Sequence, residues 1–433
     1  MKTTTQTIPP RVVGPLLAAA LAAVLAGCGA NAPAGDPSVS DSPSAAAATE
    51  TQAAQPRIAY TYDGGIVVLD ATSLETLADI PLDGFNRLNS AGDGRHLVVS
   101  TSGGFRLLDL GAYGVPHGGH SHYYIADPVL TDITFAAQTP GHVVSHDDQT
   151  ALFDDGTGRV TLIEADEIGD PDAPRREYSA AAPHHGVAVL MGDGVLLVTE
   201  GTTDYRSTVQ AVDQQDQVLA QSADCPGVHG EAVAAGEVVV FGCQGGVLLY
   251  QDGVFSRLEA PSATASVGTQ VGGEDSAVVL GDYEDEDDGA AGPNRVSLTD
   301  TATAQFQVVD LPAGVSYSSR SLARDQEGAA LVLGTDGALH VIDPLSRSLV
   351  ASHPVLPAWS LPDEWQQTRP TIAMLDGMAY ITDPAAQKLY VVYPKSGQIW
   401  KTVDLAHVPN EITGVSGDGG GEHDHDEEDH EDD

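Results

Sequence analysis

Basic residues are scarce in this sequence. Lys and Arg account for 19 of 433 residues, against 62 Asp and Glu, which gives a formal net charge of −43 with His neutral. Such a charge repels the phosphates of nucleic acids and the head groups of anionic lipids, so nucleic-acid binding is excluded and cations are favoured as ligands. Charged residues make up 19% and hydrophobic residues 42%, which is enough to bury a core.

The sequence also lacks the short motifs of the common enzyme classes. It has no G-x-S-x-G nucleophile motif, no H-E-x-x-H zinc motif and no phosphate-binding or dinucleotide-binding glycine motif. We therefore expect a protein that catalyses no reaction. A metal-dependent hydrolase stays open as an alternative, because a catalytic zinc with an open position uses the same ligand types as a binding site.

Hydrophobic runs long enough to cross a membrane are missing. The apolar run from Val12 to Ala26 is too short for a free transmembrane helix, and it follows Lys2 and Arg11 as in a secretory signal. The run ends in L-A-G-C, which resembles the bacterial lipobox, with Cys28 as the lipidated residue. We predict a lipoprotein signal peptide at residues 1–27 and a disordered tether at 28–56, so the protein would lie outside the cytoplasmic membrane and contact it through the lipid anchor alone.

Cysteine is rare, and two cysteines remain after Cys28. Cys225 and Cys243 flank a predicted hairpin whose turn lies at Ala234-Ala235-Gly236, near the midpoint of the pair. Both sulfur atoms would then meet at the open end of the hairpin, and export favours oxidation, so we predict a disulfide. A pair of zinc thiolates is the alternative.

Short β-rich runs bounded by Gly, Asp and Asn fill residues 57–416, with no convincing long amphipathic helix. Candidate inner strands recur near residues 86, 142, 184, 228, 266, 317, 370 and 410. The span of 360 residues divided by eight is 45 per unit, the usual size of a propeller blade. We predict an all-β fold, a single eight-bladed β-propeller closed by pairing N- and C-terminal strands. Seven blades are the next choice, and a pair of β-sandwiches is weaker.

Beyond the repeats, residues 417–433 end the chain in a run of carboxylates that includes His423, His425 and His430. A segment of this composition has nothing to bury, so we predict a disordered tail. Its dense imidazole and carboxylate groups would gather divalent cations weakly. The alternative is a tail that only improves solubility.

Histidine placement is the main chemical signal. His117, His120 and His122 lie within PHGGHSHYY, a predicted loop after the strand FRLLDL, where glycines would let several imidazoles converge. A polar surface loop is the plain alternative.

A second set of histidines recurs at the start of predicted inner strands. His146, His185 and His229 are spaced by 39 and 44 residues, about one blade each. Equivalent blade positions lie on a ring around the central axis, so these imidazoles could meet at one point, with the PHGGHSHYY loop leading into the same side. Nearby carboxylates could act as further ligands or orient a histidine; they are Asp147, Asp224 and Glu231. The alternative is a structural role in hydrogen bonds between blades.

Nitrogen and carboxylate ligands favour Zn(II), with Cu(II), Ni(II) and Mn(II) behind it. The four methionines do not cluster, which argues against a Cu(I) site.

Several of these segments together resemble the AztD family of zinc metallochaperones. They are GFNRLNSAGDGRHLVVSTSGGFRLLD, PHGGHSHYY, the HHG and VHGEA segments and the cysteine pair, and the resemblance spans about residues 57–416. It implies a propeller outside the cytoplasmic membrane that binds Zn(II) and passes it to the solute-binding protein of an ABC zinc importer. We expect a monomer. A metal-free propeller that binds another envelope protein is a further alternative.

Overall fold

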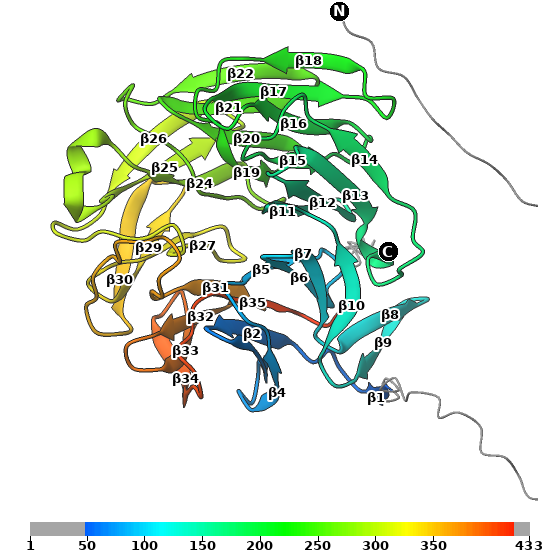
Figure 1. Cartoon of the computed structure of the whole chain (residues 1–433). Helices are drawn as coiled ribbons and strands as arrows, with labels where there is room; N and C mark the ends of the chain where they lie inside the picture. Colours follow the sequence, from blue (N-terminus) through cyan, green and yellow to red (C-terminus); the bar gives the residue numbers. More distant parts are fainter. Residues whose placement is uncertain (1–47, 420–433) are drawn as a thin grey trace, which may run out of the picture. The chain divides into compact units, whose positions relative to one another are not determined.

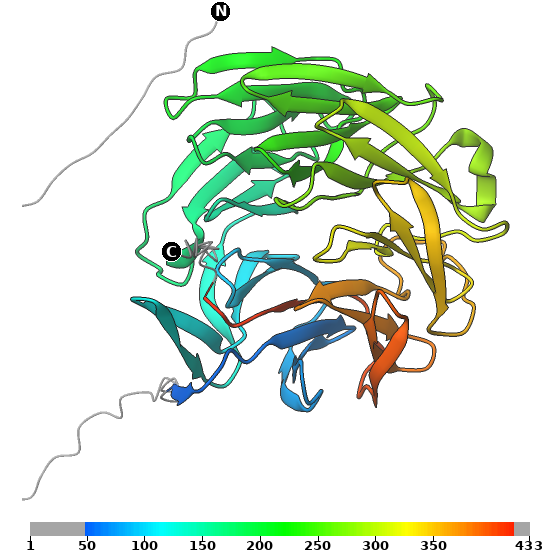
Figure 2. The same ribbon diagram turned by 180° about the vertical axis from the view of Figure 1, so that it is seen from behind.

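Eight four-stranded antiparallel sheets form the framework of residues 48–419, the part of the chain that the computed structural model describes. In Figures 1 and 2 the sheets follow one another in sequence order around a common centre. The described residues contain two short 3₁₀ helices, η1 (Ala165–Glu167) and η2 (Glu286–Ala291). The all-β prediction is therefore confirmed.

Four sheets come from the first half of the described chain, and the strands of each follow in order from its first strand outward. They are β5 (Arg87–Ser90), β6 (His96–Thr101), β7 (Gly104–Asp109), β10 (Val129–Phe135); β11 (Pro140–His146), β12 (Gln149–Asp154), β13 (Arg159–Glu164), β14 (Arg176–Ser179); β15 (Ala188–Leu190), β16 (Leu196–Gly201), β17 (Arg206–Val212), β18 (Val218–Ser222); and β19 (His229–Ala234), β20 (Val238–Cys243), β21 (Gly246–Gln251), β22 (Val254–Glu259).

The other four sheets come from the second half and from the two ends of the described chain. They are β23 (Gln270–Val271), β24 (Val278–Tyr283), β25 (Arg295–Asp300), β26 (Gln305–Asp310); β27 (Leu322–Arg324), β28 (Ala330–Leu333), β29 (Ala338–Asp343), β30 (Ser348–Pro354); β31 (Ile372–Leu375), β32 (Met378–Asp383), β33 (Lys388–Tyr393), β34 (Gln398–Asp404); and β35 (Ile412–Val415), β2 (Arg57–Tyr62), β3 (Gly65–Asp70), β4 (Thr76–Pro81).

The last sheet joins the two ends of the described chain. Strand β35 pairs with β2 in an antiparallel register that sets Val415 opposite Arg57 and Ile412 opposite Tyr60. The sequence predicts such a pairing of N- and C-terminal strands, and the pairing puts β2 and β35 side by side (Figure 1). The predicted inner-strand positions each lie within five residues of the start of the first strand of a sheet.

Burial follows the position of each strand within its sheet. Central strands such as β3 and β20 are buried along almost their whole length, because other sheets pack on both of their faces, and they read as continuous apolar runs. Outer strands such as β30 alternate between exposed and half-buried residues. The core lies between neighbouring sheets, as where Val189 and Leu197 pack with Val239 and Leu248.

A hairpin inserted between β7 and β10 departs from the regular order. Strands β8 (Ala112–His117) and β9 (His120–Ile125) pair with each other, and β1 (Thr49–Thr51) adds to the free edge of β9. The turn consists of Gly118 and Gly119, and Gly118 has φ of 62°, a conformation that glycine adopts without strain. The PHGGHSHYY segment is therefore a β-hairpin, whereas a loop was expected from the sequence.

Some predictions fall outside the described residues. They concern the signal peptide, Cys28, most of the tether, and the tail residues His423, His425 and His430. Within residues 48–419, no helix has the length and apolar character needed to cross a bilayer.

Candidate metal centre

Three imidazoles converge on one cavity near the start of the first strands. His142 lies on β11, His185 lies shortly before β15, and His229 is the first residue of β19. The cavity has a volume of about 470 Å³, and Arg87 and Glu231 also line it. Three successive sheets thus each contribute one histidine from an equivalent position. We call these three residues the inner histidine cluster.

The spacing of these side chains fits a tetrahedral metal ion. One ligand atom from each histidine lies within 4.8 Å of the other two. The ring centroids of the three pairs are 4.9, 5.0 and 5.3 Å apart. Two ligands about 2.1 Å from a tetrahedral zinc are about 3.4 Å apart, so small side-chain rotations suffice to bring the nitrogens to bonding positions. Three histidines leave a fourth position for another ligand.

Hydrogen bonds orient two of the three rings. Nδ1 of His185 lies 2.6 Å from Oδ2 of Asp155, and Nδ1 of His229 lies 2.7 Å from the carbonyl oxygen of Gly268. A carbonyl oxygen and an ionised carboxylate can only accept, so Nδ1 carries the hydrogen in both rings and Nε2 keeps its lone pair. Metal-binding histidines are commonly oriented in this way.

A β-bulge at Gly230 positions His229. The register between β19 and β20 shifts between His229 and Glu231, and Gly230 has φ of 63°. A Cβ atom at Gly230 would lie 2.0 Å from the carbonyl oxygen of Gly268, which is the oxygen that binds His229. Glycine is therefore required for this carbonyl to reach the imidazole.

Burial controls the protonation of the cluster. Burial, and then the charges of His229 and His185, hold the pKa of His142 well below its usual value, and burial also lowers the pKa of His229. Glu231, whose Oε2 lies 3.8 Å from Nδ1 of His142, has its pKa raised to about 8 by burial. At pH 7, His142 and His229 are therefore neutral, which is the form that binds a metal.

His146, predicted to join His185 and His229, lies elsewhere. It is buried at the far end of β11, with its Nδ1 3.1 Å from Glu274 and its Nε2 3.0 Å from Glu237. Carboxylate groups thus occupy both ring nitrogens, and His146 is not among the residues that line the inner cavity.

His142 takes the position that was expected for His146, and sequence reasoning missed it. A signal was present, because the spacings from His142 are 185 − 142 = 43 and 229 − 185 = 44, which are more even than 39 and 44.

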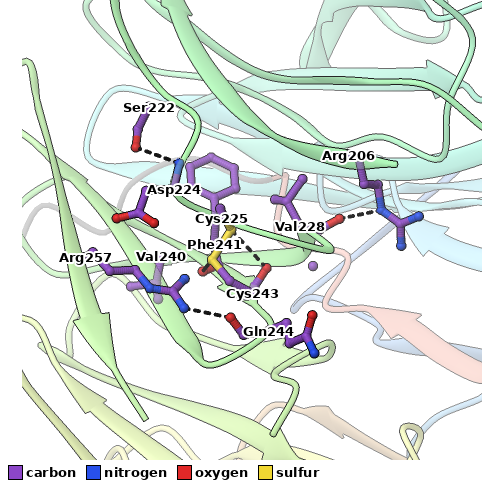
Figure 3. Close-up of a disulfide and its surroundings, with 12 residues drawn as sticks. Arg206, Ser222, Asp224, Cys225, Val228, Val240, Phe241, Cys243, Gln244 and Arg257 are labelled. Atoms are coloured by element: carbon purple, nitrogen blue, oxygen red, sulfur yellow. Dashed lines mark hydrogen bonds between the residues drawn. A yellow bond between two sulfur atoms is a disulfide. The ribbon is translucent and has the colours of Figure 1, made fainter. Parts of the chain in front are cut away.

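The three carboxylates that were predicted near the site lie in different places in the structure. Glu231 lines the cavity. Asp147 lies in the turn between β11 and β12, and Asp224 is exposed beside the disulfide, with its backbone N–H bound to Ser222 (Figure 3). Asp155, which follows β12 and binds His185, was not predicted.

The hairpin histidines form a second cluster, apart from the inner one. Ligand atoms of His117, His120 and His122 lie within 4.8 Å of one another. The Nε2 atoms of His120 and His122 are 3.2 Å apart, and Nδ1 of His122 lies 2.7 Å from Oε1 of Glu50 on β1. Among the described residues, those that line the inner cavity do not include this hairpin, although it was expected to lead into the same site.

The predicted disulfide joins Cys225 and Cys243 (Figure 3). Both cysteines are buried in the core cluster that contains Val228, the residue before His229. Gly242, the neighbour of Cys243, pairs with His229 across the strands. The cross-link thus supports the backbone that carries one of the inner histidines, and it excludes zinc thiolates at these positions.

Known proteins resemble this chain over most of its length. No protein-family model matches it. The sequence is 27% identical over 386 residues to the zinc chaperone AztD of Citrobacter koseri, which covers 84% of this chain and 88% of that protein. The fold is similar to a crystal structure of Citrobacter koseri AztD, with a TM-score of 0.72 and 26% identity over 84% of this chain and 99% of that one. A structure of apo AztD from the same organism has a TM-score of 0.71 and 25% sequence identity, over 84% of this chain and 98% of that one. Over most of its length, the chain is thus similar in sequence and in fold to the zinc chaperone AztD of Citrobacter koseri.

Proposed function

We propose that this protein is a zinc metallochaperone. It holds Zn(II) at the inner histidine cluster and passes it to the solute-binding protein of an ABC zinc importer. The observation that carries this proposal is the convergence of three imidazoles, two of them oriented through Nδ1, on a cavity with room for a fourth ligand. The relative from Citrobacter koseri is named a zinc chaperone, which supports it.

The chemistry of the cluster suits transfer rather than permanent storage. Neutral imidazole nitrogens bind zinc, and closed structural sites have four protein ligands. A site with three protein ligands leaves one position for an incoming group, so an acceptor can add its first ligand before the histidines release the ion. We propose that this exchange is the function and that no substrate is chemically changed.

The hairpin cluster and the tail would collect zinc for the inner site. Glu50 orients His122 as Asp155 orients His185, and the hairpin histidines are largely exposed, so this second site would exchange its metal quickly. The described chain ends at Gly419, which packs against the backbone of Gly114 on β8. Residues 417–419 of the chain therefore lie beside the hairpin.

The architecture and location complete the proposal. We propose that the eight sheets are the blades of one β-propeller closed by the pairing of β35 with β2. We also propose that the protein is a monomer outside the cytoplasmic membrane, anchored through a lipid on Cys28. These points rest on the repeat pattern and on the lipobox-like sequence.

Zinc titration of three proteins tests the function. The first is the full chain, the second has His142, His185 and His229 changed to Ala, and the third has His117, His120 and His122 changed to Ala. We expect tight zinc binding in the first and third proteins and its loss in the second. Zinc-loaded protein mixed with a zinc-specific solute-binding protein should then lose its metal to it.

Two results would contradict the proposal. One is a second protein that binds zinc as tightly as the unchanged chain. The other is zinc-dependent hydrolysis of ester or lactone substrates by the loaded protein, which would indicate an enzyme.

A further inference from the structure

Positive charge surrounds the inner histidine cluster, although the protein carries a net charge of −43. Arg87 and Arg320 line the same cavity as the three histidines. Both guanidinium groups share one carboxylate, because Nε of Arg87 and Nη2 of Arg320 each lie 3.2 Å from Oε1 of Glu411. The two guanidinium groups thus have one carboxylate between them, on the side of a site for a divalent cation where both line the cavity.

The two arginines are held differently. Arg320 is nearly buried, donates to Oδ1 of Asn410 at 2.5 Å and to the carbonyl oxygen of Trp365 at 3.2 Å, and so has a structural role. The side chain of Arg87 is 46% exposed, and its ion pair with Glu411 uses Nε. The outer nitrogens of Arg87 are thus available to a ligand that enters the cavity.

The charge of Arg87 disfavours the binding of a metal ion alone at the inner histidine cluster. Arg87 lines the cavity together with the three imidazoles, so its positive charge lies near any cation that they bind. Among the described residues, Glu231 lines the cavity with its carboxyl group, and Asp155 accepts a hydrogen bond from Nδ1 of His185, so neither carboxyl group contacts Arg87. A zinc ion would therefore enter beside the guanidinium group of Arg87, and an anionic ligand between the two cations would relieve their repulsion.

We propose that the inner cavity binds a carboxylate-bearing ligand together with zinc, and that Arg87 holds this carboxylate. The inference rests on the proposed zinc site. One carboxylate oxygen would occupy the fourth zinc position and the other would accept hydrogen bonds from Arg87, which suits the planar guanidinium group. The carboxylate would come from an acidic side chain of the acceptor or from a small free acid.

The surrounding space is large enough for a peptide segment. A second cavity of about 550 Å³ shares Arg87, His185 and Trp365 with the first. Trp365 is 58% exposed and packs edge-on against Phe85, with ring centroids 5.1 Å apart. An exposed tryptophan that packs on a half-buried phenylalanine beside a charged pocket is typical of a surface that binds another protein.

The test measures zinc affinity of the full chain at pH 7 by competition with a chromophoric chelator. Titrations are run with sodium acetate and with sodium perchlorate at equal ionic strength. We expect acetate to tighten the zinc dissociation constant about tenfold in the unchanged protein, the size expected of a charge-assisted hydrogen bond. In Arg87→Gln this response should fall to less than about twofold.

The same variant should show a second effect of opposite sign. In perchlorate, Arg87→Gln should bind zinc more tightly than the unchanged protein, because a repelling charge has been removed. Arg87→Lys keeps the charge but lacks the planar fork, and we expect it to keep the weaker affinity in perchlorate and part of the acetate response. The matched control is Lys395→Gln, since Lys395 carries the same charge but pairs with Glu327 in the turn between β27 and β28. It should behave as the unchanged protein.

A short peptide containing Asp, compared with the same peptide containing Asn, distinguishes the source of the carboxylate. An effect of the Asp peptide supports an acidic side chain, and an effect of acetate alone supports a small acid. If neither probe alters zinc affinity, or if Arg87→Gln responds as the unchanged protein does, the carboxylate proposal is wrong while the zinc site stands. If the unchanged chain binds no zinc under any condition, the proposed function itself fails.

Discussion

Zinc binding at pH 7 should release close to one proton from Glu231. Burial raises the pKa of this carboxyl group to about 8, so at pH 7 the protonated form exceeds the ionised form by about ten to one. Oε2 of Glu231 lies 3.8 Å from Nδ1 of His142, so a zinc ion bound by the cluster would be close to it. His142 and His229 have lowered pKa values and are already neutral at pH 7, so they would release almost none.

The charge of the ion is sufficient to expel this proton. A divalent charge about 5 Å from a carboxylate stabilises its ionised form by about 7 kcal/mol at an effective dielectric constant of about 20. One pKa unit corresponds to about 1.4 kcal/mol, so the carboxyl group of the loaded protein ionises well below pH 7. The release should therefore be about 0.9 proton per zinc at pH 7 and about 0.1 at pH 9, where the metal-free group is already ionised.

Calorimetric titration in buffers of different ionisation enthalpy measures this number. The slope of the observed enthalpy against the buffer enthalpy gives the protons released per zinc. Glu231→Gln should reduce the release by about 0.9 at pH 7 while it keeps the three histidines. An unchanged slope in this variant, or a release that is as large at pH 9 as at pH 7, would show that Glu231 does not lose a proton when zinc binds.

Three further predictions concern the packing around the cluster. His142→Ala should weaken zinc binding by at least about a hundredfold, measured by zinc titration. His146→Ala, in the same strand, should leave the affinity within about twofold, because Glu237 and Glu274 occupy the ring nitrogens of His146. A larger loss in His146→Ala than in His142→Ala would refute the assignment of His142 to the zinc site. Replacing both Cys225 and Cys243 with Ser opens a loop with a sequence separation of 18 and should lower the free energy of unfolding, measured in urea, by about 3 kcal/mol. Equal stability of the variant and the unchanged protein would count against a stabilising disulfide. Gly230→Ala should destabilise the fold by more than about 2 kcal/mol and weaken zinc binding, because Gly230 has a positive φ and the new Cβ would meet the carbonyl oxygen of Gly268. Gly236 also has a positive φ but faces open space, so Gly236→Ala should lower stability by about 1 kcal/mol and leave the zinc affinity unchanged.

Local sequence patterns were sufficient to predict the fold class and part of the candidate zinc site. Alternating and continuous apolar runs bounded by turn residues depend on strand periodicity, so the sequence alone indicates a repeated all-β fold and the approximate start of each first strand. The cysteine pair could be matched because both residues flank one hairpin. His185 and His229 were identified because the repeat puts them at equivalent places in successive units.

The choice between His142 and His146 depended on tertiary structure. The two residues are four apart, so strand alternation assigns both to the same face, and only their position along the strand differs, by about 13 Å. A register shift between Pro140 and Val143 also breaks the regular alternation near His142, and such a bulge has no clear sequence signature. Even spacing favoured His142, but spacing alone cannot show which end of a strand faces the cavity.

By itself, the sequence determined the all-β repeats, the disulfide and the residue types suited to zinc, because these depend on composition and on contacts within one hairpin or repeat. The tertiary structure decided that the PHGGHSHYY histidines form a separate cluster on a hairpin, that Asp155 and Gly268 orient the inner imidazoles, and that Arg87 faces them. The contacts of Asp155, Gly268 and Arg87 join residues from different sheets, and Glu50 reaches His122 from a distant part of the chain, so these distances are set by tertiary packing.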